Sequence, residues 1–243
     1  MKNKGLALCL GAGLLAAAPA LRAQDKEQRE NNDRLAASVA VFHEIMATPD
    51  RGIPHDLFDR AQCVVIVPGV KKGAFIVGAE YGKGYFTCRR HSGHGWTAPG
   101  AVIVEGGSFG FQIGGEETDV VMLVMNDEGE RRLLSSQFKL GGDASVAAGP
   151  VGRNASADTD LYMGAEILSW SRSRGVFAGV SLAGATVRQD LKENNALYGR
   201  MITNKEVIEG QSSVPAQAEP LVQTLTRYSP RKNEVREHTA SAN

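Results

Sequence analysis

The chain has 243 residues, and 42% of them are hydrophobic, which is enough to bury one good core. Residues 1–23 carry three basic residues and no acid, and without them the chain keeps 24 basic and 27 acidic residues. This weakly acidic balance excludes a general attraction to nucleic acid. The 28 glycines lie mostly in strand-like segments, so they favour a β-rich protein over a helical bundle.

Residues 1–23 have the pattern of a secretory signal peptide. Lys2 and Lys4 precede an apolar run over residues 6–18, which is short for a membrane span. Small residues then offer cleavage sites after Ala20 or Ala23. We therefore expect an exported protein, periplasmic or peripherally associated with the bacterial outer membrane.

The first structured segment is predicted to be an amphipathic helix over residues 25–48. Its apolar residues Leu35, Val39, Phe42 and Met46 recur at intervals of three and four, and its first turns are charged. Such spacing places the apolar side chains on one face, which can pack on a sheet.

Strand-like segments follow a second short helix that begins near residue 54. Residues 63–67 are a continuous apolar run and predict a buried strand. Residues 74–81 and 85–89 then predict a hairpin whose turn is the Gly-Lys-Gly segment at 82–84.

A glycine-punctuated meander is predicted over residues 95–126. Its three strand-like runs cover residues 101–105, 108–114 and 120–125. The middle run alternates apolar and small residues, whereas the last is apolar throughout and should be buried on both faces. The sequence therefore predicts an α+β fold, with a strongly curved, mostly antiparallel, Gly-rich sheet or barrel-like sandwich covered by short helices.

Shorter elements complete the expected domain. We predict a helix over residues 127–136 that Asp127 caps, followed by a second hairpin formed by residues 166–173 and 176–187. Three covering helices are predicted over residues 190–198, 204–209 and 221–228. The composition becomes polar and charged after residue 209. We therefore place a single domain at residues 24–209 and a partly disordered tail at 210–243.

Two of the expected strands carry a face of very small residues. One face holds Gly179, Ser181, Ala183 and Ala185, and the other holds Ser108, Gly110 and Gly114. Small side chains let another backbone approach closely. We expect these faces to meet each other or a helix.

Cys63 and Cys88 are the cysteines outside the signal-like segment. In the expected meander a middle strand separates them, and strands one place removed lie beyond disulfide reach, since neighbouring strands are about 4.8 Å apart. We therefore expect two buried free thiols rather than a disulfide, although export would permit the bond.

No residue pattern gives a convincing catalytic or metal site. Gly106, Ser108 and Gly110 match the bare hydrolase nucleophile pattern, but the following residues alternate as a strand where that motif needs a helix. His91 and His94 have only Cys88 nearby as a further ligand, and the acidic cluster Glu116, Glu117 and Asp119 reads as a solvated turn. We expect no enzyme activity, no metal and no cofactor.

A local excess of basic residues between positions 64 and 100 is more informative. It comprises Lys71, Lys72, Lys83, Arg89 and Arg90, against a single acid, Glu80. Turns at one end of the hairpins would place Lys71 and Lys72 beside Arg89, with Lys83 at the other end. Trp96 and Tyr85 could add aromatic side chains at a membrane interface. Such a patch would attract anionic lipid head groups, although an ordinary solvated hairpin explains it equally well.

A series of motifs in order along residues 53–199 resembles the SYLF domain family. The motifs are GWTAP at 95–99, GSFGFQIG at 107–114, TDVV at 118–121, LGGDASVAAGPVGR at 140–153, SRSRGVFAGV at 171–180 and Tyr198-Gly199. The resemblance implies lipid binding, notably of phosphoinositides in eukaryotic members, and actin binding in yeast relatives. It does not imply an enzyme.

One departure from the family qualifies this expectation. Lipid binding in eukaryotic members depends on a basic amphipathic segment at the domain's N-terminus, whereas residues 25–34 here mix both charges. We therefore expect binding to anionic phospholipid at a bacterial envelope membrane, through Lys71, Lys72, Lys83, Arg89, Arg90 and Trp96. The alternatives are a structural or protein-interaction component of the envelope and, less in keeping with the motifs, a hydrolase.

Overall fold

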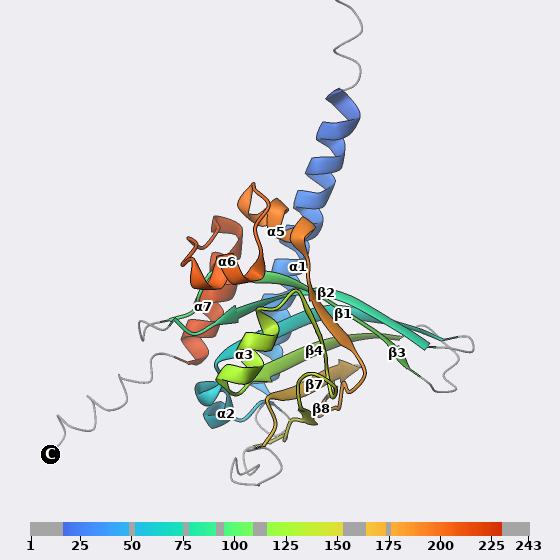
Figure 1. Ribbon diagram of the computed structural model, residues 1–243, viewed down its shortest axis with the longest axis vertical. Coiled ribbons are helices and arrows are strands. Elements are labelled where there is room, and N and C mark those ends of the chain that lie inside the picture. The colour runs from blue at the N-terminus through green and yellow to red at the C-terminus, as the bar shows by residue number, and fades with distance from the viewer. Residues whose placement is uncertain are drawn as a thin grey trace, which may run out of the picture.

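The computed structural model describes residues 17–48, 52–74, 78–90, 95–108, 116–152, 164–173 and 176–229. Its centre is a curled, half-barrel-like sheet that is mostly antiparallel, with helices on both sides (Figure 1). Nine strands join this sheet within the described residues, and eight of them follow the order β5-β9-β3-β2-β1-β4-β7-β6, with β8 beside β7. The predicted α+β class with a strongly curved sheet is confirmed.

Four long strands form the middle of the sheet. They are β1 (Cys63–Ala74), β2 (Gly78–Cys88), β3 (Gly100–Ser108) and β4 (Glu116–Val124). β1 lies between β2 and β4, and β3 lies on the other side of β2. The valine-rich runs in β1 and β4 suit strands that are covered on both faces.

Short strands extend both edges. β5 (Gln137–Lys139) and β9 (Thr186–Gln189) continue the sheet beyond β3, while β7 (Ile167–Ser173), β6 (Val146–Ala148) and β8 (Val176–Gly179) continue it beyond β4. The β6–β7 pair is parallel, and the other named pairs are antiparallel.

Helices cover the two faces of the sheet. They are α1 (Ala17–Ala47), α2 (His55–Arg60), α3 (Asp127–Leu133), α5 (Leu191–Tyr198), α6 (Asn204–Glu209) and α7 (Glu219–Tyr228), which a short 3-10 turn, η1 (Ala216–Ala218), precedes. The sequence predicts correctly where α5 and α6 begin, because each has a capping residue. Asp190 and Thr203 accept hydrogen bonds from backbone N–H groups in the first turns of α5 and α6. In α3 the cap is Asn126 rather than the expected Asp127, and its side chain accepts from Gly129 N–H.

Two apolar cores lie on opposite faces of the sheet. α1, α2 and α7 pack on one face, around Phe42, Phe58 and Trp170. α3, α6 and β5 cover the other face, around Phe86, Met122 and Leu133. Alternate residues of β1 therefore enter different cores, as the strand period of two requires.

The predicted hairpin over residues 74–89 is wrong, because residues 78–88 form the single strand β2. The glycines at 82 and 84 serve close packing rather than a turn. A β-carbon at Gly84 would lie 2.1 Å from the carbonyl oxygen of Ile66 on β1, and one at Gly82 would lie 2.7 Å from Val70 Cγ2. Glycine is thus the residue that lets β2 approach β1 closely where the pairing of the two strands shifts register, between Ile66 and Lys71.

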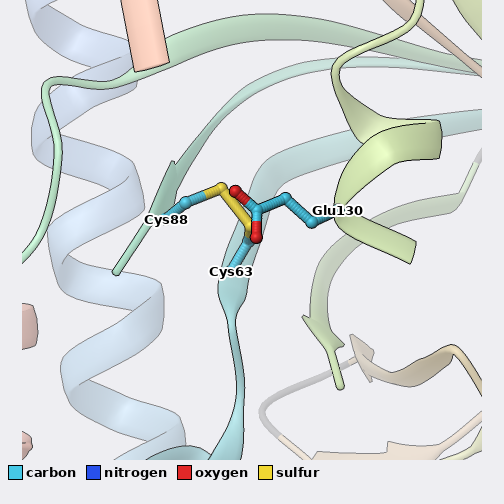
Figure 2. A group of neighbouring side chains, drawn as sticks. All are labelled: Cys63, Cys88 and Glu130. Carbon is cyan, nitrogen blue, oxygen red and sulfur yellow. A yellow bond between two sulfur atoms is a disulfide. The ribbon is translucent and has the colours of Figure 1, made fainter. Parts of the chain in front are cut away.

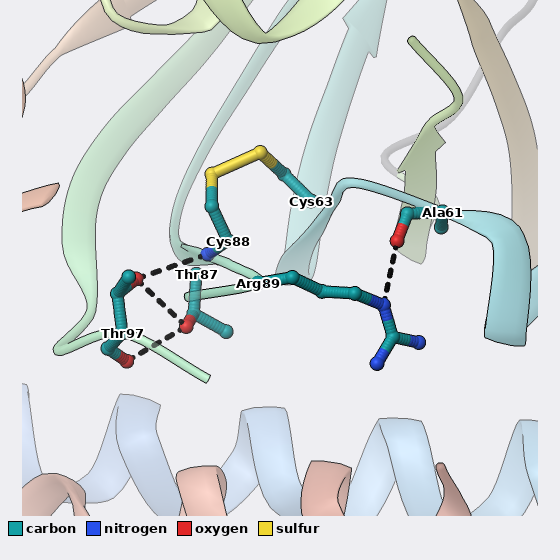
Figure 3. The surroundings of a disulfide bond; sticks show 6 residues. All are labelled: Ala61, Cys63, Thr87, Cys88, Arg89 and Thr97. Atoms are coloured by element: carbon teal, nitrogen blue, oxygen red, sulfur yellow. Dashed lines mark hydrogen bonds between the residues drawn. A yellow bond between two sulfur atoms is a disulfide. The ribbon is translucent and has the colours of Figure 1, made fainter. Parts of the chain in front are cut away.

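The expectation of free thiols is wrong for the same reason. With no middle strand between them, Cys63 and Cys88 are directly opposite each other on β1 and β2, and they form a disulfide (Figure 3). Thr97 supports this end of β2 by accepting the Cys88 N–H and bonding to the Thr87 hydroxyl. The two strand ends are thereby joined covalently and through hydrogen bonds.

The single strand expected over residues 176–187 is wrong, because this segment forms two separate strands. It consists of β8, a turn, and β9, which pair with β7 and β3 on opposite sides of the sheet. The small residues do mark close approaches, since a β-carbon at Gly106 would lie 3.2 Å from Ala185 Cα, and one at Gly179 would lie 2.0 Å from Gly149 O. Gly110 and Gly114 of the other small-residue face lie outside the described residues.

The chain beyond residue 209 contributes to the core. Leu221 and Leu225 of α7 are fully buried in the core that α1 completes. The domain limits at 24–209 stay a prediction, and residues 230–243 lie outside the described part of the chain. Among the described helices, none combines the length and apolar character that crossing a membrane requires.

Candidate functional site

The six basic and aromatic candidate residues do not gather in one patch. Cys63 pairs with Cys88 at one end of the β1–β2 ladder, and Lys71 pairs with Tyr81 toward the other. Eight residues of strand separate Cys63 from Lys71, which is on the order of 25 Å at about 3.3 Å per residue. The expected neighbours Lys71 and Arg89 are therefore far apart, and Lys83 lies nearer Lys71 than expected.

Lys71 lies on the exposed part of the ladder. Its side chain is exposed, and its cross-strand partner on β2 is Tyr81, which is 44% exposed. On β4 its partner is the exposed Glu117. Lys72 follows in β1, with its backbone opposite Glu80 and Glu116. This end of the ladder thus combines lysines with an exposed aromatic ring and several acids.

Lys83 is held within an ionic cluster between α1, β2 and α5. Its ammonium lies 2.6 Å from Asp190 Oδ2 and 3.4 Å from Glu193 Oε2, and 25% of its side chain is exposed. Arg34 of α1 pairs with the same Glu193, and the Tyr85 hydroxyl donates to Glu193 Oε1 at 2.9 Å. Lys83 therefore joins elements of the fold through its two carboxylate partners.

Burial and charge together set the pKa values in this cluster. Burial alone would lower the pKa of Lys83, but its hydrogen bond to Asp190 and its attraction to both carboxylates outweigh burial and raise that pKa. The pKa of Arg34 is raised by the same balance, with Glu193 as the main partner. Burial, followed by the Glu193 carboxylate, raises the pKa of Tyr85, so its phenol stays protonated. The cluster thus keeps two cations and a neutral phenol around the carboxylates.

Arg89 and Trp96 form a structural contact between the sheet and two helices. The Arg89 guanidinium donates to the carbonyls of Phe58 and Ala61 and to the Ser229 hydroxyl, each at 2.8–2.9 Å. It also lies 4.4 Å from the centroid of the Trp96 ring, which is 1% exposed. Trp96 is therefore covered, and the Arg89 guanidinium is engaged in contacts within the fold.

Arg90 is exposed next to a small cavity at the same end of the ladder. Its Nε donates to Trp96 O at 2.9 Å, and the cavity of about 50 Å³ lies between Arg90, Ala98 and Ile208. Gln211 lines it too and has a φ of 49°, in the left-handed region. The cavity is too small for a lipid head group, so Arg90 can offer only its exposed guanidinium.

The structure describes only some of the residues that the sequence offers for a catalytic or metal site. Ser108 ends β3 opposite Gly78, and the residues after it, where a hydrolase nucleophile needs a turn into a helix, lie outside the described part of the chain. His91 and His94 lie outside the described residues. Glu116, Glu117 and Asp119 lie in β4 and not in the expected turn, and Asp119 accepts Gly69 N–H and pairs with Arg172.

An open groove of about 780 Å³ runs along α1. Ala37 and Ala40 line one side, and Gly69 and Glu117 line the other. The arginines that reach it, Arg34 and Arg172, are already paired with carboxylates. The groove therefore offers acidic groups rather than free cations to a ligand.

Tyr81 is the exposed aromatic residue that the sequence pattern misses. The pattern favours Tyr85 as an interfacial aromatic, yet Tyr85 is fully buried beneath α1. Residues 81, 83 and 85 share one face of β2, so alternation alone cannot tell which of them α1 covers. To tell Tyr81 from Tyr85, one would need to know that β2 is a single long strand that extends past the part of the sheet that α1 covers.

Comparison with known families gives one match over half of the chain. The Ysc84 family, described as "Las17-binding protein actin regulator", matches residues 105–228. The match runs from the end of β3 to the last residue of α7, and it includes the sheet edge formed by β7, β8 and β6.

Curated relatives are similar over a longer part of this chain. An SH3 domain-containing protein of Schizosaccharomyces pombe is 37% identical over 177 residues, which is 71% of this chain and 40% of that protein. Protein YSC84 of Saccharomyces cerevisiae is 34% identical over 72% of this chain and 38% of its own length. The human SH3 domain-containing YSC84-like protein 1 is 34% identical over 74% and 52%. The chain thus spans about half or less of the length of these relatives.

Proposed function

This chain belongs to the Ysc84 family of SYLF domains, and from that premise we propose that it binds anionic phospholipid head groups at a membrane surface. The observation that carries the proposal is the exposed pair of Lys71 and Tyr81, side by side on β1 and β2. A lysine beside a tyrosine suits a membrane interface, because the ammonium attracts phosphate while the ring enters the head-group layer.

The surroundings of this pair limit the strength of the proposed binding. Glu117 lies opposite Lys71, and Glu80 and Glu116 lie opposite Lys72. A nearby lysine contributes about 1 kcal/mol toward an anionic surface, and these acids reduce that contribution. We therefore expect weak binding that falls as salt is added, because screening acts on exposed charges.

Vesicle co-sedimentation of the full chain tests the proposal. We expect binding to vesicles with anionic phospholipid at low salt and none to neutral vesicles. The double variant Lys71→Gln/Lys72→Gln should bind up to about 30-fold more weakly, since two lysines without the neighbouring acids would contribute about 2 kcal/mol. The matched control is Arg131→Gln/Arg132→Gln, which removes the same charge from two exposed, adjacent residues of α3.

Two results would contradict the proposal. One is a wild-type chain that stays in the supernatant with anionic vesicles at low salt. The other is an equal loss of binding in the Lys71/Lys72 and Arg131/Arg132 variants, since that would show a response to net charge rather than to this surface.

Export to a bacterial envelope membrane is part of the proposal. The signal-like residues 1–23 support it, although the candidate cleavage positions after Ala20 and Ala23 lie within α1, which begins at Ala17. Expression in a bacterial host should give a periplasmic protein whose intact mass lacks 20 or 23 residues. A full-length chain confined to the cytosolic fraction would contradict export.

A protein partner is the second candidate function, in the envelope or elsewhere. The groove along α1 favours it, as does the family description, which names a protein that the Ysc84 proteins bind. Its acidic groups suit a basic segment. A stoichiometric partner whose capture is lost on Ala37→Glu, in a chain that does not bind vesicles, would favour this function over lipid binding.

A further inference from the structure

A buried carboxylate lies against the disulfide in the core opposite α1. Glu130 of α3 is 8% exposed, and Cys63 and Cys88 are 0% exposed. One carboxylate oxygen and the two sulfur atoms all lie within 4.8 Å of one another. Figure 2 shows the carboxylate pointing at the sulfur pair from the opposite side of the core.

The fold fixes all three residues in this position. Cys63 and Cys88 are paired directly across β1 and β2, and Val124, at the end of β4, is paired with Cys63 on the other side. α3 begins just after β4, with Asn126 as its cap. Gly129 lets the helix lie close to the sheet, because a β-carbon there would be 2.7 Å from Val124 Cγ1. The residue after this glycine is Glu130, which is thereby held over the sulfur atoms.

We propose that the reduced protein binds a thiophilic divalent cation, of which Zn²⁺ is the type, through the thiolates of Cys63 and Cys88 and the carboxylate of Glu130. Zinc accepts cysteine sulfur at about 2.3 Å and carboxylate oxygen at about 2.0–2.2 Å. Two thiolates and one carboxylate oxygen give three donor atoms, and a water molecule would complete the four that a tetrahedral site needs. Neither the family membership nor the proposed lipid surface, which is at the other end of β1, assigns this site.

The chemistry requires a reductant of the thiol class. Two thiol equivalents reduce the protein disulfide to two cysteine thiols and leave as their own disulfide. Binding of the cation then releases two protons, one from each thiol. Both sulfurs are buried, so the reductant reaches them when this end of the ladder opens, or acts before the chain folds.

The disulfide and the metal are alternative ways to close the same junction. The disulfide joins β1 to β2, whereas a cation would join β1, β2 and α3. Because metal binds the folded state better than the unfolded one, it should raise the stability of the reduced protein. Oxidation to the disulfide should release the cation, because a disulfide has no thiolate to donate.

Cobalt titration of the full chain, purified and kept reduced without oxygen, tests the proposal. Co²⁺ reports sulfur ligands through a thiolate-to-metal charge-transfer absorption, which we expect to saturate at one equivalent and to disappear when Zn²⁺ is added. The Glu130→Gln variant should bind at least about tenfold more weakly, since a ligand is lost. The matched control Glu128→Gln removes an exposed carboxylate from the same helix and should bind as the wild type does.

Three results would overturn the proposal. The first is a reduced, folded chain that gives no charge-transfer absorption. The second is equal affinity in Glu130→Gln and wild type, which would indicate only two adjacent thiols. The third result applies if the reduced chain does not stay folded. In that case, failure of one equivalent of Zn²⁺ to restore the circular dichroism spectrum of the folded protein would show that the site does not exist.

Discussion

At the scale of single residues, the charge of Lys83 suits either a lipid contact or an ion pair within the fold. Its position among Lys71, Lys72 and Arg89 in the sequence favours a lipid contact, whereas the fold places its ammonium between Asp190 and Glu193. A partly buried cation with two carboxylate partners stabilises the structure only while all three groups are present, because each group alone is costly to bury.

We therefore expect Lys83→Met to destabilise the protein by about 2 kcal/mol, because Asp190 and Glu193 would lose their shared cation. Urea unfolding measures the change. The control is Lys192→Met, whose lysine makes an exposed pair with Glu27 and should matter by less than about 0.5 kcal/mol. Equal effects of the two substitutions would contradict the assignment of Lys83 to the fold.

The raised pKa of Lys83 also predicts a pH dependence. A lysine whose folded pKa exceeds its unfolded value of about 10.4 contributes its full stabilisation below that pH. The contribution is lost as the pH rises through the folded pKa. The stability difference between wild type and Lys83→Met should thus be constant from pH 7 to about 9.5 and shrink as the pH rises well above about 10.4. A difference that grows above pH 10 would show that the pKa is lowered.

At the scale of elements, α7 packs beyond the predicted end of the domain at residue 209. The change to a polar composition after residue 209 predicts a tail, yet Leu221 and Leu225 are buried against the helix α1. Two apolar residues four apart are a weak sequence signal, and their importance becomes clear only when α1 is seen to need a neighbour. The match to the Ysc84 family also extends to residue 228, where α7 ends.

We expect Leu225→Ala to cost about 3 kcal/mol of unfolding free energy, because it leaves a cavity between α7 and α1. Chemical denaturation measures this, with the exposed Gln223→Ala of the same helix as the control, expected within about 0.5 kcal/mol of wild type. An unchanged stability in Leu225→Ala would mean that α7 is dispensable and that the domain ends near residue 209.

Some elements were predictable from sequence and others were not, for physical reasons. The helices α5 and α6 have local caps at Asp190 and Thr203, so their starts are written in short stretches of sequence. β2 was not predictable as one strand, because Gly82-Lys83-Gly84 has the composition of a turn. Only the close approach of β1, with Val70 beside Gly82 and Ile66 beside Gly84, explains these glycines, and these contacts are not local in sequence.

At the scale of the whole molecule, the length of the β1–β2 ladder separates two groups of cations. The motifs that run along the chain predict the family and the curved sheet correctly, since both depend on the order of the segments. The predicted basic patch, in contrast, depends on the distances between strand ends. Because a hairpin was wrongly predicted at residues 82–84, Lys71 and Arg89 were expected to lie side by side. The misassigned strand also hid the Cys63–Cys88 pairing, and with it the position of Glu130.

We propose that the membrane contacts the Lys71–Tyr81 end of the ladder and not the Arg89–Trp96 end. A Tyr81→Trp variant tests it most directly, because the native Trp96 and Trp170 are buried and should give a constant background. We expect anionic vesicles to shift the added tryptophan emission to the blue, and brominated lipid to quench it, while neutral vesicles have no effect. A variant that sediments with the anionic vesicles but shows neither change would contradict the claim.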